Sequence, residues 1–131
     1  MRFFVTEDRI CGERIALEPT DAQHVSRVVT VGEIVPFETA LKEAAQSDCG
    51  LFLYEKEQQK SLSTVLRGGT GNRFAVVTGP EGGFSEKEAL LAQEAGLACV
   101  SIGPRILRCE TAPVAAVCAI MYETGNFDIG E

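Results

Sequence analysis

The fold is decided by the stretch FAVVTGPEGGFS, residues 74–85, whose plan is repeated by LACVSIGPRILRCET, residues 97–111. In each stretch a short, mostly apolar run with β-branched residues leads directly into a glycine-proline loop. Such runs are typical of strands buried on both faces of a parallel sheet. Because ligands bind at the carboxyl ends of the strands in open parallel sheets, both loops are candidate binding loops.

The segment between the two loops carries helix signals at both ends. Ser85 and Glu88 fit a capping box, and Gly96 stands where a left-handed helix stop is expected. Strand, helix and strand within about 30 residues predict a βαβ unit with a right-handed crossover. We therefore expect the two loops to lie side by side, at neighbouring strand ends, and to form a pocket.

The predicted pocket offers main-chain groups and carboxylates. The chain contains neither Gly-x-Gly-x-x-Gly nor Gly-x-x-x-x-Gly-Lys-Ser/Thr, the patterns that cradle phosphates. Glu81 and Glu110 place negative charge beside the pocket. This combination favours a neutral heterocycle or a cationic ligand over a polyphosphate. Glycine-proline pairs also mark ordinary turns, but two of them at matched positions favour a binding role.

Several of these residues resemble a known family. Residues 79–85 and 101–112 are similar to the C-terminal motifs of the RsmE-type 16S ribosomal RNA methyltransferases of the SPOUT superfamily, which make N3-methyluridine in small-subunit RNA. Residues 1–5 and 21–28 resemble the start of the PUA-like RNA-binding domain of that family. Residues 31–37 and 43–47 resemble its middle, so the resemblance extends over nearly the whole chain.

The resemblance implies an α/β fold, a SPOUT-type parallel sheet with a C-terminal trefoil knot, preceded by a fragment of a PUA-like β domain. It divides the chain into a partial N-terminal PUA-like domain, residues 1–30, and a methyltransferase domain, residues 31–131. At 131 residues the chain is short for this family, and the family landmarks follow one another too closely. We therefore expect missing internal segments between Val29 and Val31, after Thr39 and near Gly50.

The same resemblance implies S-adenosyl-L-methionine as the cofactor. The positions that match the family's cofactor-binding motifs are Leu53, Gly79, Glu81, Gly82, Ile102, Gly103, Ile106, Leu107 and Thr111. The stretch that ends with Leu53, Tyr54 and Glu55 looks like a further strand whose end adds a third wall to the pocket.

Arg108 and Glu110 are the candidate catalytic residues. A guanidinium can stabilise negative charge on a uracil carbonyl, and a carboxylate can take the proton from uracil N3. The alternative is an ion pair between the two that only fixes the loop. Cys109 stands where the family pattern has a threonine and is a weaker donor, and Pro113 replaces a small residue.

For contact with ribosomal RNA the candidates are Arg2, Arg9 and Arg27, because basic side chains neutralise phosphates. The chain has 12 basic and 19 acidic residues and a formal net charge of −7. This composition argues against a protein that binds RNA electrostatically over its whole surface, but it allows a local basic patch.

The cysteine pattern argues against a zinc site. The five cysteines are at least nine residues apart and His24 is the single histidine, so we expect no metal. Cys99 and Cys118 lie in apolar segments and are expected to be buried. The chain shows no secretory signal and no apolar span of about 18 residues, which predicts a cytoplasmic protein.

A last helix is predicted after Thr111, which can cap it, and before Gly125. Residues 114–121 are apolar on every side, so this helix must be covered by the sheet on one side and by another element on the other. A second copy of the chain or a larger core can supply that cover. The resemblance favours the homodimer, since SPOUT enzymes typically pair through this helix.

Two other functions stay open. One is a SPOUT methyltransferase that acts at another RNA position, because the C-terminal motifs do not name the base. The other is a non-catalytic nucleotide-binding and dimerisation module that kept the pocket. The N-terminal resemblance favours uridine N3 in small-subunit ribosomal RNA.

Overall fold

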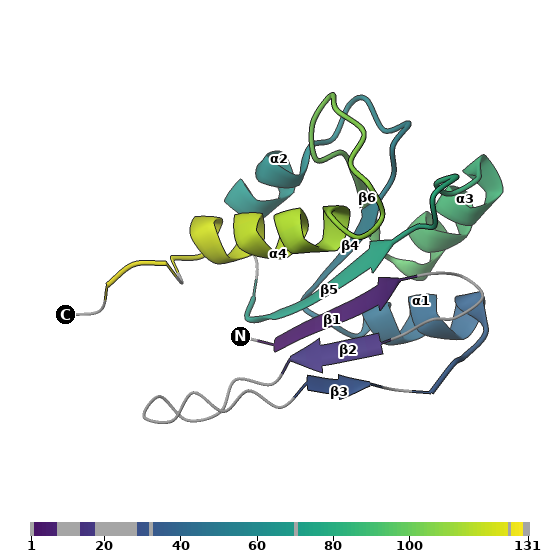
Figure 1. The fold of residues 1–131 in the computed structure, drawn as a ribbon, viewed down its shortest axis with the longest axis horizontal. Helices are drawn as coiled ribbons and strands as arrows, with labels where there is room; N and C mark the ends of the chain where they lie inside the picture. Colours follow the sequence, from purple (N-terminus) through teal and green to yellow (C-terminus); the bar gives the residue numbers. More distant parts are fainter. Residues whose placement is uncertain are drawn as a thin grey trace.

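The computed structural model describes residues 2–7, 14–17, 29–31, 33–69, 71–125 and 127–129, with the backbone alone before residue 33. In these ranges the chain forms one mixed sheet with helices on both faces (Figure 1). The strands are β1 (Arg2–Glu7), β2 (Arg14–Leu17), β3 (Val29–Val31), β4 (Cys49–Leu53), β5 (Arg73–Thr78) and β6 (Ala98–Val100). The helices are α1 (Phe37–Ala45), α2 (Leu62–Arg67), α3 (Glu86–Ala95) and α4 (Ala112–Glu123).

The strand order in the sheet is β3-β2-β1-β5-β4-β6. The four strands β1, β5, β4 and β6 run parallel to one another, while β2 and β3 continue the sheet in antiparallel pairing beyond β1. The predicted α/β class with parallel pairing around the glycine-proline loops is confirmed.

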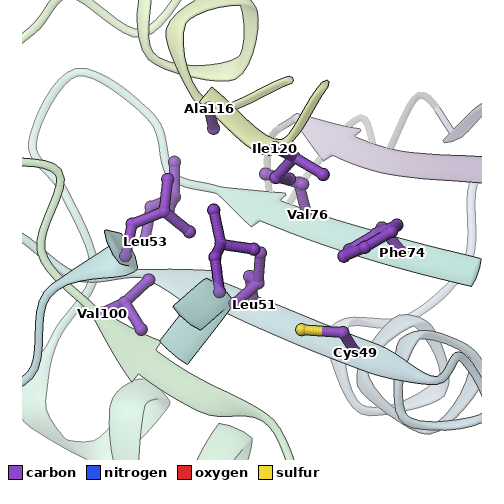
Figure 2. Packing of buried hydrophobic residues seen from close by; sticks show 10 residues of the cluster. Cys49, Leu51, Leu53, Phe74, Val76, Val100, Ala116 and Ile120 are labelled. Carbon is purple, nitrogen blue, oxygen red and sulfur yellow. The ribbon is translucent and has the colours of Figure 1, made fainter. Parts of the chain in front are cut away.

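Both faces of the parallel strands are covered, as the continuous apolar runs predict. One face packs against α2 and α4, and Figure 2 shows this cluster between β4, β5 and α4. Its buried residues are Cys49, Leu51, Leu53, Leu62, Leu66, Phe74, Val76, Val100, Ala116 and Ile120. The other face packs against α1 and α3, through Leu41, Ala44, Phe52, Ala75, Val77, Phe84, Ala89, Ala92, Leu97 and Cys99. Alternate residues of β4 and β5 therefore enter opposite cores.

The predicted crossover helix is confirmed as α3. The side-chain oxygen of Ser85 accepts from the Glu88 amide at 3.2 Å, and the Glu88 carboxylate accepts from the Ser85 amide at 3.0 Å. Gly96 ends the helix at φ 101°. No helix in the described part of the chain combines the length and the apolarity that crossing a membrane requires.

One expectation about this unit is wrong. The strands β5 and β6, which α3 connects, are not neighbours, because β4 lies between them and pairs with both. The run at Leu51 signals a strand, but nothing in it gives the position of that strand in the sheet. The two glycine-proline loops therefore emerge on either side of the end of β4.

The positions at which we expect missing internal segments lie inside regular elements. Thr30 is in β3, Thr39 is in α1 and Gly50 is in β4. A long segment inserted there would interrupt a strand or a helix, so this fold gives the expected gaps no support. The strands of residues 2–31 belong to the same sheet as β4–β6, and their assignment to a separate domain stays a prediction.

Replacing Leu51 by alanine tests the importance of the central strand. Leu51 of β4 is 0% exposed in the core that the sheet forms with α2 and α4, so Leu51→Ala should lower the free energy of unfolding by about 2–5 kcal/mol. Leu90→Ala in α3 is the matched control, because Leu90 is 58% exposed and its loss should cost less than about 0.5 kcal/mol. Urea denaturation followed by circular dichroism measures both. Equal losses in the two variants would contradict the buried position of β4.

Candidate functional site

The carboxyl ends of β5, β4 and β6 lie at the same edge of the sheet, and a cavity of about 380 Å³ opens there. The register sets this common edge, because Phe52 of β4 pairs with Val77 of β5 and with Cys99 of β6. The cavity is lined by residues of the three segments that follow these strands, residues 79–84, 54–55 and 101–110. The two glycine-proline loops therefore share one cavity even though their strands are not adjacent.

The loop after β5 is anchored in the core by Phe84. The Phe84 ring stacks on Phe52 with centroids 4.1 Å apart and lies 5.9 Å from the ring of Phe37. A Cβ atom on Gly79 would come within 3.1 Å of the Phe84 ring, so the ring packs directly on the start of its own loop. Gly83 completes the turn at φ 71° and donates its amide to the Pro80 carbonyl at 2.8 Å. This wall of the cavity is held by aromatic packing.

The segment after β4 is hydrogen-bonded to the end of β6 at both of its own ends. The Tyr54 amide donates to the Val100 carbonyl at 3.0 Å, and the Ser101 amide donates to the Lys60 carbonyl at 2.9 Å. A Cβ atom on Gly83 would lie 3.2 Å from a carboxylate oxygen of Glu55, which brings this segment against the loop after β5. Residues 54–60 therefore form a closed loop whose two ends meet at the base of the segment after β6.

The segment after β6 is tied down at both of its ends. The Ser101 hydroxyl accepts from the Gly103 amide at 3.2 Å and donates to the Gly103 carbonyl at 3.1 Å. Gly103 has φ 118°, a value that side chains other than that of glycine rarely permit. At the other end the Arg108 carbonyl accepts from the amides of Thr111 and Ala112, both at 2.9 Å. The residues between these ties are exposed or half-buried around the cavity mouth.

The predicted cap of α4 is wrong. Thr111 precedes the helix, but its side chain makes no capping hydrogen bond, because its backbone is already helical at φ −89° and ψ −37°. Pro113 lies in the first turn of the helix, and Gly125 follows the helix end at φ 78°, where the helix is predicted to stop.

The cavity is lined by three carboxylates and two guanidiniums. The carboxylates belong to Glu55, Glu81 and Glu110, and the guanidiniums to Arg105 and Arg108. In the described part of the chain none of these five side chains takes part in an ion pair. Charges of opposite sign thus line one cavity without neutralising one another, which leaves them available to a ligand.

The thiol of Cys109 interacts with the carboxylates that line the cavity. It donates a hydrogen bond to a Glu110 carboxylate oxygen, with sulfur and oxygen 3.3 Å apart. This hydrogen bond, together with desolvation and the negative charges of Glu110 and Glu81, raises the pKa of Cys109 above its ordinary value. At neutral pH Cys109 is therefore a neutral thiol that occupies part of the hydrogen-bonding capacity of Glu110.

Most of the predicted site residues line the cavity. They are Leu53, Gly79, Glu81, Ile102, Gly103, Ile106, Leu107, Arg108 and Glu110. Gly82 and Thr111 are exposed and are not among the lining residues, although their neighbours Glu81, Gly83 and Glu110 are. Of the predicted RNA-contacting residues, Arg2 lies in β1, whereas Arg9 and Arg27 fall outside the described residues.

Sequence reasoning did not single out Arg105, Thr78 or Phe84 as site residues. Arg105 lies in the same stretch as the predicted cofactor-binding residues Gly103 and Ile106. Its place in that stretch is the one sequence signal that it lines the cavity. Thr78 is the last residue of β5 and is 2% exposed, so nothing in its strand distinguishes it from a core residue. Within the described residues no three histidine, cysteine or acidic side chains are grouped as metal ligands require.

Comparison with known proteins gives the same family at the level of sequence and of structure. The ribosomal RNA small subunit methyltransferase E of Bacillus subtilis is 32% identical over 117 residues, which cover 85% of this chain and 45% of that protein. Its counterpart in Aquifex aeolicus is 46% identical over 48 residues, covering 37% of this chain and 21% of that protein. The chain therefore spans less than half the length of these relatives.

A solved structure of the same methyltransferase from another organism is similar to this chain in fold and in sequence. The ribosomal RNA small subunit methyltransferase E of Neisseria gonorrhoeae, bound to S-adenosyl methionine, superposes with a TM-score of 0.62 at 34% identity. The superposition covers 70% of this chain and 38% of that one. A family model described as RNA methyltransferase domain matches residues 13–121, and since this is most of the chain, the chain belongs to that family.

Proposed function

We propose that this chain is the S-adenosyl-L-methionine-binding part of an enzyme that methylates N3 of a uridine in small-subunit ribosomal RNA. The observation that carries the proposal is the single cavity in which both glycine-proline loops meet the end of β4. The solved relative from Neisseria gonorrhoeae, whose superposition covers 70% of this chain, is bound to S-adenosyl methionine. The names of the relatives supply the small-subunit RNA, and the family resemblance supplies uridine N3.

The residues of the cavity fit such a methyl donor. A volume of about 380 Å³ is within the range of small-molecule sites. Leu53, Ile102 and Leu107 offer apolar surface for an adenine ring. Ile106, although 78% exposed, also lines the cavity. The carboxylates of Glu55 and Glu81 suit the positive charges of an ammonium and a sulfonium. When bound, the donor supplies an activated methyl group and a neutral leaving group.

The catalytic roles fall to Arg108 and Glu110. Uracil N3 carries a proton that must leave, and the carboxylate of Glu110 can accept it. The guanidinium of Arg108 can stabilise the negative charge that develops on a ring carbonyl oxygen. In the described part of the chain the two side chains form no ion pair, so the alternative in which they only fix the loop lacks its defining contact.

The finer fold assignments belong to the same proposal. Residues 54–60 close a loop on β6 through Tyr54 and Lys60, and the segment that follows Ser101 starts at the base of this loop. A trefoil knot requires that segment to pass through such a loop. We also assign residues 1–30 to a fragment of a PUA-like domain, on the family resemblance alone.

The exposed face of α4 supports the proposed homodimer. Val114, Cys118 and Tyr122 follow one another at helical spacing on this face and are exposed, whereas Ala116 and Ile120 pack into the core. The expectation that Cys118 is buried is therefore wrong for the single chain. An apolar face of this kind is covered when a second copy packs against it.

Substituting Gly103 tests the donor site. Gly103→Ala forces a side chain onto φ 118° at the cavity wall, so the affinity for S-adenosyl-L-methionine should fall at least tenfold in calorimetric titration. Gly96→Ala is a matched control, because it imposes a similar strain at φ 101° at the end of α3, outside the cavity. Equal affinities of the two variants would show that the donor binds elsewhere.

Truncating Arg108 tests the catalytic assignment. Arg108→Ala should lower the methylation rate by about 10²–10³, because the developing charge on uracil loses its partner. The affinity for the donor should stay within about twofold, which mass spectrometry of the RNA and calorimetry measure separately. Arg73→Ala, at the opposite end of β5, should methylate normally. Normal methylation by Arg108→Ala would remove Arg108 from the mechanism.

A charge on the outer face of α4 tests the dimer. Cys118→Glu places a carboxylate in the middle of the apolar face and should convert a dimer into a monomer, as measured by light scattering after size exclusion. Leu90→Glu puts the same charge at an exposed apolar position of α3 and should leave the mass unchanged. A parent chain that is monomeric, or a dimeric Cys118→Glu variant, would contradict pairing through α4.

A further inference from the structure

The proposed reaction brings a strongly acidic partner to an acidic chain. The formal net charge of the chain is −7, and Glu55, Glu81 and Glu110 line the cavity itself. When the base of a uridine lies in this cavity, the phosphates bonded to its ribose lie at the cavity mouth. There the three carboxylates repel them, so binding requires a cation at the same place.

Only nearby cations can meet this requirement. Exposed charges separated by more than about 8 Å are largely screened at physiological salt. Among the residues that line the cavity, Arg105 and Arg108 are the basic ones. Of the residues that line the cavity, these two guanidiniums are therefore the ones placed to neutralise phosphate at the mouth.

The positions of the two arginines in the segment separate their tasks. Arg108 lies at the end of the segment that joins α4. Its carbonyl accepts hydrogen bonds from two amides at the start of α4, and the neighbouring Cys109 thiol donates a hydrogen bond to Glu110. Arg105 lies between the hydrogen bonds of Ser101 and those of the Arg108 carbonyl, in the exposed run 103–106, and no described residue forms an ion pair with it. Gly103 at φ 118° and the ring of Pro104 fix the backbone that presents it.

We propose that Arg105 binds a backbone phosphate of the RNA strand that delivers the target base. This inference rests on the proposed function and names the group by which the site holds its RNA substrate. The guanidinium fork matches phosphate oxygens in a bidentate manner, and its positive charge offsets the repulsion from Glu81 and Glu110. A phosphate contact carries no base information, so Arg105 contributes affinity and position rather than sequence choice.

Salt dependence of RNA binding tests this role. The probe is a fluorescently labelled, uridine-containing single-stranded oligonucleotide from small-subunit ribosomal RNA, titrated with the full chain at several salt concentrations. Arg105→Gln should weaken binding several-fold at low salt and reduce the slope of log affinity against log salt by about 0.7, the value for one phosphate contact. The loss should be the same when the uridine is replaced by cytidine. Arg105→Lys should restore the slope, and Arg73→Gln, at the far end of β5, should leave it unchanged.

The other outcomes overturn the inference in distinguishable ways. An unchanged slope in Arg105→Gln would show that no phosphate is bound there. A parallel loss of S-adenosyl-L-methionine affinity, measured by calorimetry, would show that Arg105 instead holds the carboxylate of the donor. A parent chain that binds neither the oligonucleotide nor the donor would overturn the proposed function and this inference together.

Discussion

The site depends on the parallel pairing of β4 with both β5 and β6. Because Phe52 pairs with Val77 on one side and with Cys99 on the other, the three strands end at one level. Their apolar side chains fill the cores on both sheet faces, so a shift of β4 by one residue would exchange its two buried faces. The same pairing that buries the core therefore brings three connecting segments around one cavity.

The cavity walls differ in what holds them. Phe84 ties the loop after β5 to the aromatic cluster with Phe52, whereas backbone hydrogen bonds at Val100 and Ser101 close the loop after β4. Among the residues that the structure describes, the hydrogen bonds that fix the segment after β6 lie at Ser101 and at the start of α4, and the exposed middle of the segment carries Arg105 and Ile106. Two walls held by core packing and backbone hydrogen bonds, with a more exposed third wall, fit the proposal that the site holds a small donor and admits an RNA strand.

Much of this arrangement follows from the sequence, because its signals are local. The apolar runs before Gly79 and Gly103 predict the strands, and Ser85, Glu88 and Gly96 predict both ends of α3. The position of β4 between β5 and β6 is not predictable in this way, since strand order depends on packing between distant segments. For the same reason the sequence predicts a buried Cys118, although the structure leaves that face of α4 exposed. Arg105 is missed because the sequence does not show that it lines the same cavity as Glu55, Glu81 and Glu110.

The central claim is that the two glycine-proline loops bind one ligand between them. Titration of S-adenosyl-L-methionine into the ¹⁵N-labelled chain, followed by amide chemical shifts, tests it most directly. The amides of residues 81–83, of Gly103 and of residues 105–107 should shift together along a single binding curve, while the amides of residues 41–44 in α1 stay in place. Shifts confined to one of the two loops, or two curves with different midpoints, would contradict the account.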